Sequence, residues 1–155
     1  MHVSPERFRA DWETAFGSME APELPPLPRR ATSGSAGYDF YAPFAFDLDP
    51  GKTISIPTGV RARISEGWVL MLFPRSGLGF KYRLQLNNTV GIVDADYFNA
   101  HNEGHIFIKL INAGDRSIRV DAGEAFAQGV FLPFGLTEDD DAQGERTGGF
   151  GSTDR

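Results

Sequence analysis

The chain from residue 36 to residue 133 consists largely of short runs in which apolar and polar residues alternate. Four such runs are Ile54 and Ile56, Val60 to Ile64 with two interspersed arginines, Leu84 and Leu86, and Ile106 to Ile111. A period of two is typical of strands with one buried face. Trp68 to Phe73 is apolar throughout, which predicts a strand buried on both faces. Turn signals such as Asp49-Pro50-Gly51 recur about every eight to twelve residues, so the pattern predicts an all-β sandwich or barrel.

One stretch near the N-terminus has a helical pattern instead. Ser4-Pro5-Glu6 combines a capping serine with a proline suited to the first helical position. Phe8, Trp12 and Phe16 follow at a spacing of four residues, which puts them on one face of a helix. We expect a short amphipathic helix that ends near Gly17 and packs either on the body of the protein or on a neighbouring subunit.

Composition changes mark the boundaries of the β region. Residues 22–28 are rich in proline, which predicts an extended linker or an edge segment. After Pro133 the alternation stops, residues 138–141 are acidic, and residues 143–155 are rich in glycine and small polar residues. The expected division is therefore a helical extension at 1–21, a β domain at 22–136 and a flexible C-terminal arm at 137–155.

Length, cysteine content and net charge exclude several classes of protein. A chain of 155 residues buries one respectable core, so a single domain with small additions is expected. The absence of cysteine excludes disulfides, thiol catalysis and thiolate metal sites. The net charge of -6 opposes general attraction to nucleic acid or anionic lipid, so we expect neither partner. The sequence shows no apolar run of spanning length and no signal-peptide pattern, which predicts a cytoplasmic protein.

Three polar clusters interrupt the β pattern outside its central stretch. Asp39 lies at a strand entry, where a structural role at the strand edge is the alternative. Residues 74–79 place a guanidinium, a hydroxyl and glycine amides after the most apolar strand. These groups could bind an anion, and a plain loop with a surface arginine is an equal alternative. The glycine-rich tail carries Phe150, Ser152 and Thr153. It is either a disordered end or a lid that orders on a flat, phosphorylated ligand.

The stretch from Gly91 to Tyr97 is the fourth cluster, and it places two carboxylates and a tyrosine within one turn of chain. Either Asp94 or Asp96 could orient a water as a base, and a solvated hairpin is the alternative. His101 and His105 have a spacing that brings ligands together only on a helix, whereas residues 99–104 resemble a hairpin loop. We therefore expect both histidines on the surface rather than on a metal.

Taken in order, these segments resemble the five motifs of the trimeric dUTP pyrophosphatase (dUTPase) family. The resemblance covers residues 31–153 and rests on Ala31 to Asp39, Pro74 to Leu78, Gly91 to Tyr97, Gly123 to Gln128 and the glycine-rich tail. It implies a homotrimer of jelly-roll-like subunits with active sites between subunits. The implied activity is Mg²⁺-assisted hydrolysis of dUTP to dUMP and pyrophosphate, which limits uracil entry into DNA and supplies dUMP.

The resemblance also implies a role for individual residues. Asp94 would orient the attacking water, Tyr97 would stack under the deoxyribose, and Asn88 with the backbone near Gly91 would read uracil. Asp39 would hold Mg²⁺ through water. The implied phosphate contacts are Arg75, Ser76, Gly77, Gln128 and Arg146. In the tail, Phe150 would cover the uracil, Ser152 and Thr153 would contact the γ-phosphate, and Gly151 would also bind the substrate.

The chain departs from the family pattern at several positions. Phe98-Asn99-Ala100 replaces the usual Arg-Gly-Glu, with extra residues before Ile106, and Ala125-Phe126 replaces Arg-Ile. Arg146 stands four residues before Phe150 rather than five, and the N-terminal helix lies outside the resemblance. Two alternatives stay open, a dCTP deaminase and a dUTPase-like protein whose main task is to bind a regulatory protein through the helix or residues 98–105.

Overall fold

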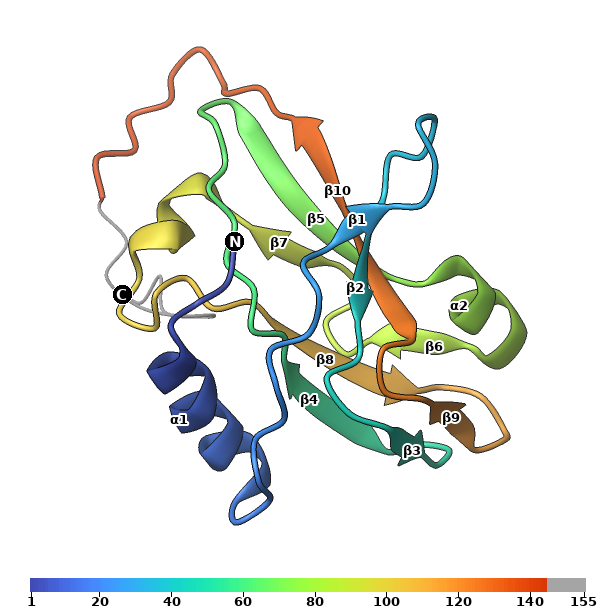
Figure 1. The fold of residues 1–155 in the computed structure, drawn as a ribbon. Coiled ribbons are helices and arrows are strands. Elements are labelled where there is room, and N and C mark those ends of the chain that lie inside the picture. Colours follow the sequence, from blue (N-terminus) through green and yellow to red (C-terminus); the bar gives the residue numbers. More distant parts are fainter. Residues whose placement is uncertain (145–155) are drawn as a thin grey trace.

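The computed structural model describes residues 1–144, which form ten strands, two α-helices and one 3₁₀-helix (Figure 1). In chain order the elements are α1 (Pro5–Phe16), β1 (Arg29–Arg30), β2 (Tyr38–Tyr41), β3 (Phe46–Leu48), β4 (Thr53–Pro57), β5 (Trp68–Pro74), α2 (Ser76–Tyr82), β6 (Leu84–Leu86), β7 (Gly91–Val93), η1 (Ala95–Asn99), β8 (Phe107–Asn112), β9 (Ile118–Val120) and β10 (Ala125–Pro133).

The strands form three antiparallel sheets, with the orders β1-β2-β10-β5-β7, β4-β8-β6 and β3-β9. Their inner faces enclose one main core, in which Ile56, Ile108, Leu110 and Phe126 are completely buried. Consecutive strands often belong to different sheets, as expected of a jelly-roll-like sandwich. The predicted all-β fold with a short N-terminal helix is confirmed.

Strand β5 lies in the largest sheet, between the central strand β10 and the edge strand β7. Its burial alternates, because Leu70 and Leu72 are buried whereas Val69, Met71 and Phe73 are only half-buried. The expectation of burial on both faces is therefore wrong for the chain by itself. An antiparallel sheet needs only one face on the core, and a continuous apolar run does not say which face that is.

The run from Val60 to Ile64 alternates in burial but forms no strand among the described residues. Val60 and Ile64 are buried, as predicted, and Arg63 is exposed. Only an isolated bridge joins Val60 to His2, and the Arg61 amide donates to the Met1 carbonyl at 2.9 Å. The Val60 carbonyl accepts from the Ile106 amide at 2.9 Å, and the Val60 amide donates to Thr58 Oγ1 at 3.2 Å. The predicted strand is wrong because such single bonds, rather than a strand ladder, satisfy the backbone of Val60 and Arg61.

Helix α1 begins and ends where the sequence predicts. The Ser4 hydroxyl accepts a hydrogen bond from the Arg7 amide at 3.1 Å, and the Gly17 amide donates to Glu13 O at 2.8 Å. α1 lies beside β4 (Figure 1). Phe8 and Trp12 are buried, so within the single chain the helix packs on the body of the protein. Burying each of these side chains contributes about 2–3 kcal/mol.

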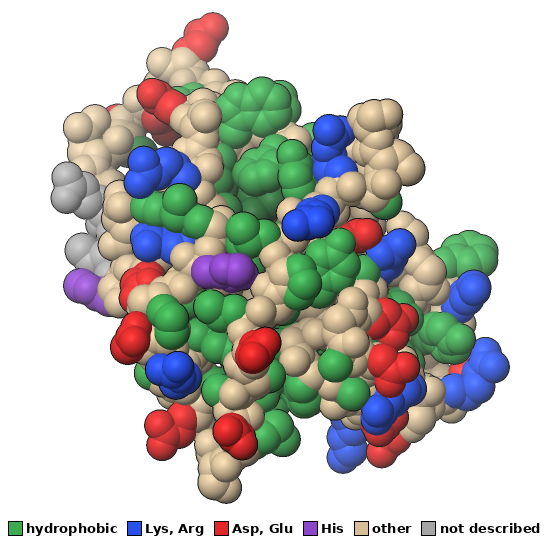
Figure 2. Space-filling model, viewed as in Figure 1, with side chains coloured by type: hydrophobic (Ala, Val, Ile, Leu, Met, Phe, Trp, Pro, Cys, Tyr) green, Lys and Arg blue, Asp and Glu red, His purple; other side chains and the backbone are tan. Residues whose placement is uncertain are grey.

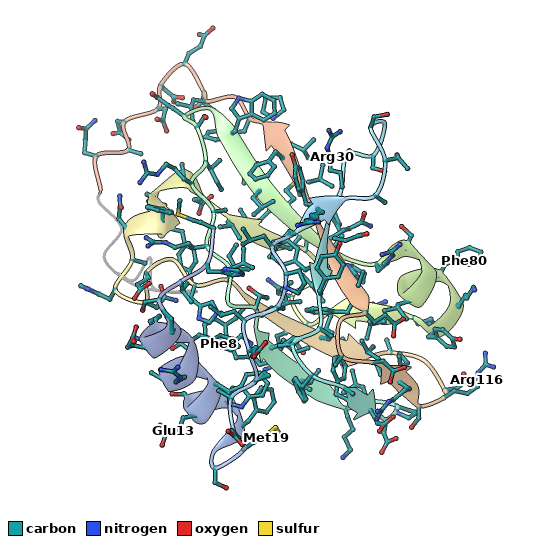
Figure 3. All side chains as sticks on the ribbon, viewed as in Figure 1. Phe8, Glu13, Met19, Arg30, Phe80 and Arg116 are labelled. Carbon is teal, nitrogen blue, oxygen red and sulfur yellow. The ribbon has the colours of Figure 1, made fainter. Side chains whose placement is uncertain are left out.

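Two short helices were not expected. The residues after Pro74 form α2 instead of a plain loop, and the residues after Asp94 form η1. The sequence of α2 has two glycines and so a poor helix propensity, but Leu78 is buried and holds the turn against the core. Phe80 points outward and is 93% exposed (Figure 3), and Figure 2 shows apolar and basic side chains together over this part of the surface.

The chain after β10 forms no helix or strand up to residue 144, and residues 134–144 are exposed. Arg146, Phe150, Gly151, Ser152 and Thr153, predicted to contact the substrate, lie outside the described residues. The division at residues 21 and 136 stays a prediction. None of the helices within residues 1–144 has the length and apolar character needed to cross a bilayer.

Candidate active site

The first group of predicted site residues gathers where β2, β10 and the start of α2 meet. Register pairs Gln128 with Asp39 on one side and with Phe73 on the other. Arg75 Nη1 donates to Asp39 Oδ2 at 2.8 Å, and Gln128 Nε2 donates to Ser76 Oγ and to the Pro74 carbonyl, both at 3.3 Å. These contacts make one polar cluster, which we call the β2–β10–α2 cluster (Asp39, Arg75, Ser76, Gln128).

The β2–β10–α2 cluster leaves cationic and neutral donors accessible. The Arg75 side chain is 43% exposed even though it is paired with Asp39, and Ser76 and Gly77 are exposed at the start of α2. A planar guanidinium with neighbouring hydroxyl and amide donors suits phosphate oxygens. Arg75, Gly77 and Lys81 also line a cavity of about 450 Å³. The cluster therefore has the chemistry of a phosphate-binding surface.

Gly37 is a close neighbour of this cluster. A Cβ at this position would lie 2.5 Å from Gln128 Oε1, which is inside van der Waals contact. Only a glycine leaves the Gln128 side chain where it reaches Ser76. The predicted motif from Ala31 to Asp39 thus contributes space as well as a carboxylate.

The second group of predicted residues surrounds a cavity of about 260 Å³. Asn88 and Gly91 line it, together with Phe107, Lys109 and Ser55, which the sequence did not indicate. Gly91 lies against Leu72, because an added Cβ would come within 3.0 Å of the Leu72 Cβ. Lys109 and Ser55 face each other in the register of β8 and β4, so the alternation of β8 could have identified Lys109 as a residue of the outer face.

Asp94 and Tyr97 follow directly on β7. Asp94 is half-buried in an extended conformation, and its carbonyl accepts from the Tyr97 amide at 3.2 Å as η1 begins. Tyr97 is 1% exposed. Its hydroxyl donates to the His105 carbonyl at 2.7 Å and accepts from Asn102 Nδ2 at 2.8 Å. The backbone and the phenol of this stretch are thus held by hydrogen bonds.

The stretch does not form the solvated hairpin that was its alternative interpretation, and the hairpin loop predicted at residues 99–104 is wrong. β7 pairs with β5, whereas β8 pairs with β4 and β6, so the chain changes sheets between Val93 and Phe107. The residues between them form η1 and a series of tight turns. A change of sheets cannot be read from alternation alone, because both partners are remote in sequence.

The predicted surface position of His105 is wrong. Its side chain is completely buried, with Nδ1 2.6 Å from Asp11 Oδ2 and Nε2 accepting from the Gly59 amide at 2.8 Å. Burial is the largest effect on this histidine and lowers its pKa, while the contact with Asp11 opposes that shift. His101 is exposed, as predicted.

Asp94 and Arg75 lie toward opposite ends of β5. Val93 pairs with Leu70, so Asp94 lies beyond Leu70, whereas Arg75 follows the other end of the strand. Five residues of extended chain span roughly 17 Å. One chain therefore presents the carboxylate of Asp94 and the β2–β10–α2 cluster as two separate parts of a site.

The donors present fit a metal ion that is shared with a ligand rather than one held by protein alone. No group of three or more His, Asp or Glu side chains in residues 1–144 could enclose a metal. Asp39 offers one carboxylate beside the phosphate-binding chemistry of Arg75 and Ser76. Mg²⁺ commonly keeps several waters and binds through one or two carboxylates plus substrate phosphates.

Comparisons with known proteins give a family match over most of the chain. The family model for dUTPase matches residues 25–154. A deoxyuridine 5′-triphosphate nucleotidohydrolase of Lactococcus lactis is 44% identical over 130 residues, which are 82% of this chain and 87% of the relative.

Solved structures give the same result. The crystal structure of a dUTPase from Streptococcus mutans is 43% identical, with a TM-score of 0.64 over 72% of this chain and 88% of that one. A mutant dUTPase from phage phi11 of S. aureus, described with a structural Mg(II) ion, has a TM-score of 0.64 over 80% of this chain and 94% of that one. At 24% identity its likeness concerns the fold alone.

Proposed function

The chain belongs to the dUTPase family, and from that premise we propose that it hydrolyses dUTP to dUMP and pyrophosphate with a water oriented by Asp94. The position of Asp94 supports this role. Asp94 directly follows β7, and the first residue of β7, Gly91, lines the cavity of about 260 Å³. A carboxylate there can accept a proton from water while the base is held a few residues away.

The cavity next to Gly91 is the proposed uracil site. The edge of uracil presents an acceptor, a donor and an acceptor, which the amide of Asn88 and backbone groups near Gly91 and Phe107 can match. Tyr97 is proposed to test the sugar, because a fixed aromatic ring beside C2′ leaves no room for a hydroxyl. Two hydrogen bonds hold its phenol in place, and because the ring is 1% exposed in the single chain, the proposed contact requires that the face of the ring become accessible when substrate binds.

The β2–β10–α2 cluster is the proposed phosphate site. Arg75, Ser76, Gly77 and Gln128 would contact phosphate oxygens and offset charge that repels the attacking water. Asp39 would hold waters of a Mg²⁺ ion, which when bound neutralises charge on the triphosphate. In the tail, Phe150 and Gly151 would cover the base, and Arg146, Ser152 and Thr153 would contact phosphates.

Homotrimeric assembly with sites between subunits is part of the proposal. The bond that breaks joins the first two phosphates, so the water at Asp94 and the phosphate contacts must act within a few ångströms of each other. The two parts of the site are roughly 17 Å apart along β5 within one chain. A neighbouring copy that supplies the β2–β10–α2 cluster would bring them together.

Replacing Asp94 by Asn tests the proposed chemistry. Asn keeps the size of the side chain but cannot accept the proton, so we expect kcat for dUTP to fall at least about a hundredfold with an unchanged melting temperature. The measurement is pyrophosphate release from dUTP, with dCTP, dTTP and UTP as competing substrates. The same change at Asp115, whose side chain is 96% exposed and which is not among the proposed site residues, should leave kcat unaltered.

Three results would decide between the candidate functions. Undiminished turnover by Asp94→Asn would remove that residue from its role, and absence of dUTP turnover by the wild type with Mg²⁺ present would overturn the function. Ammonia release from dCTP would favour a deaminase.

Chelation of Mg²⁺ by EDTA should suppress dUTP turnover and excess Mg²⁺ should restore it, because the triphosphate then regains its counter-charge.

A further inference from the structure

Helix α1, which lies outside the residues matched by the family model, contacts residues 98–105, which lie inside them. Helix α1 precedes the residues that match the family model, and residues 98–105 depart from the usual motif. The Ser4 amide and hydroxyl donate to the two carboxylate oxygens of Glu103 at 2.8 and 2.6 Å. About 10 Å further along the helix, Asp11 Oδ2 meets His105 Nδ1 at 2.6 Å. α1 is thus fastened to the 98–105 segment at two points.

The second of these points holds the imidazole of His105 from both sides. The Gly59 amide donates to Nε2, so Nε2 is the acceptor and Nδ1 carries the proton that is donated to Asp11. Asp11 is itself held by Arg7 Nε at 3.0 Å. Because the ring is completely buried, neither bond competes with water.

The backbone of His105 carries this restraint to the proposed sugar-testing residue. Its carbonyl accepts from the Tyr97 hydroxyl at 2.7 Å and from Asn102 Nδ2 at 3.3 Å. Gly104, next to it, lies so close that an added Cβ would be 2.7 Å from the Tyr97 carbonyl. The position of Tyr97 is therefore set on two sides by the segment that α1 fastens.

We propose that α1 is a positioning element of the active site, in which Asp11, acting through His105, sets the ring of Tyr97 and with it the discrimination between dUTP and UTP. The inference rests on the proposed function of Tyr97. It assigns a role in substrate selection to a helix that lies outside the family model. Asp11 and His105 are positioning residues, since they act on the sugar through Tyr97.

Glu13, on the exposed face of α1, provides the matched control for substitutions of Asp11. Phe8 on α1 points toward the strands, whereas Glu13 points away from the body (Figure 3). Asp11 is buried on the same helix. Asp11→Ala removes the acceptor of His105, and Glu13→Ala removes the same charge from the exposed face of the same helix. We expect Asp11→Ala to lower kcat/KM for dUTP about tenfold and to lower the dUTP/UTP ratio of kcat/KM, and Glu13→Ala to change neither.

Two further variants separate positioning from general stability. Asp11→Asn keeps an oxygen that can accept from Nδ1–H, so it should restore most of the dUTP/UTP ratio. Tyr97→Phe removes the anchored hydroxyl, and in that background Asp11→Ala should change the ratio far less than it does in the wild type. All rates are measured below the onset of thermal unfolding of each variant.

A lower melting temperature with an unchanged dUTP/UTP ratio in Asp11→Ala would overturn the inference and leave α1 as a packing element only. If Asp11→Ala does not fold, Glu103→Ala tests the other fastening point, and an unchanged ratio in that variant would overturn the inference as well. Failure of the wild type to hydrolyse dUTP would instead overturn the proposed function, which distinguishes the two cases.

Discussion

Close approaches between single atoms decide how the β2–β10–α2 cluster, the proposed phosphate site, is built. Gln128 reaches Ser76 and Pro74 only because the neighbouring position is Gly37, whose added Cβ would lie 2.5 Å from Gln128 Oε1. The atom that would be displaced is the end of a flexible side chain, so the backbone is not strained. A substitution at this residue should therefore disturb the site without disturbing the fold.

Gly37→Ala is expected to raise KM for dUTP or lower kcat, about five- to tenfold in kcat/KM. The reason is that Gln128 leaves its hydrogen-bonded position, and one such bond is worth about 1 kcal/mol. The unfolding free energy should change by less than about 0.5 kcal/mol. Gly34→Ala is the control, since a Cβ there meets nothing within 4 Å, and equal activity of the two variants would contradict this explanation.

Helix α1 and the 98–105 segment act as one unit at the scale of elements. Their contacts are polar and partly charged, and the buried histidine lies between Asp11 and the Gly59 amide, with Arg7 and Glu103 nearby. Burial lowers the pKa of His105 from its usual 6.5, and its bonds require the neutral ring. Attachment of α1 is therefore sensitive to acid.

The unfolding free energy should decrease as the pH falls below about 6.5. In that range the unfolded chain binds a proton at His105 and the folded chain, whose pKa is lower, does not, so acid favours unfolding until the folded pKa is reached. Above pH 6.5 the contribution is fully present. Bonds from Ser4 also lower the pKa of Glu103, so its contribution is lost at more acidic pH.

Chemical denaturation between pH 5 and pH 8 measures this slope. His105→Gln, which cannot titrate, should show a shallower dependence than the wild type, whereas His101→Gln replaces an exposed histidine and should keep the wild-type slope. Parallel pH profiles for the wild type and His105→Gln would show that His105 is not the responsible group.

At the scale of the whole molecule, the arrangement of the sheet separates Asp94 from the β2–β10–α2 cluster. This separation follows from the register of β5 with β7 and β10, which sends Asp94 and Arg75 toward opposite ends of one strand. No side-chain rotation spans roughly 17 Å, so the proposed function requires a second copy of the chain at each site.

Mixing two inactive variants tests this requirement. Asp94→Asn and Arg75→Ala should each be inactive as pure proteins, but hybrids in which one chain supplies Asp94 and its neighbour supplies Arg75 should regain activity at about one site in four after random exchange. The measurement is dUTP turnover after co-refolding. Activity that stays at the level of the separate variants would place both residues in one chain's site.

The sequence by itself determined the class of fold, the N-terminal helix and the stretch that holds Asp94. Period-two alternation and the Ser4-Pro5 cap are local signals, because they depend on neighbours in the chain. The motifs identified Asp39, Arg75 and Gln128, because a motif is defined by residue types and their order along the chain. In the structure these three residues lie together.

Only the tertiary structure decided which distant segments meet. The burial of His105, its pairing with Asp11 ninety-four residues away, the lining of the cavity by Lys109 and the change of sheets after Val93 all depend on contacts between remote parts of the chain. No local pattern carries that information, because the free energy of each contact is gained only when the whole core has assembled. The role proposed for α1 rests on such a contact, because its partner, the 98–105 segment, is remote in sequence.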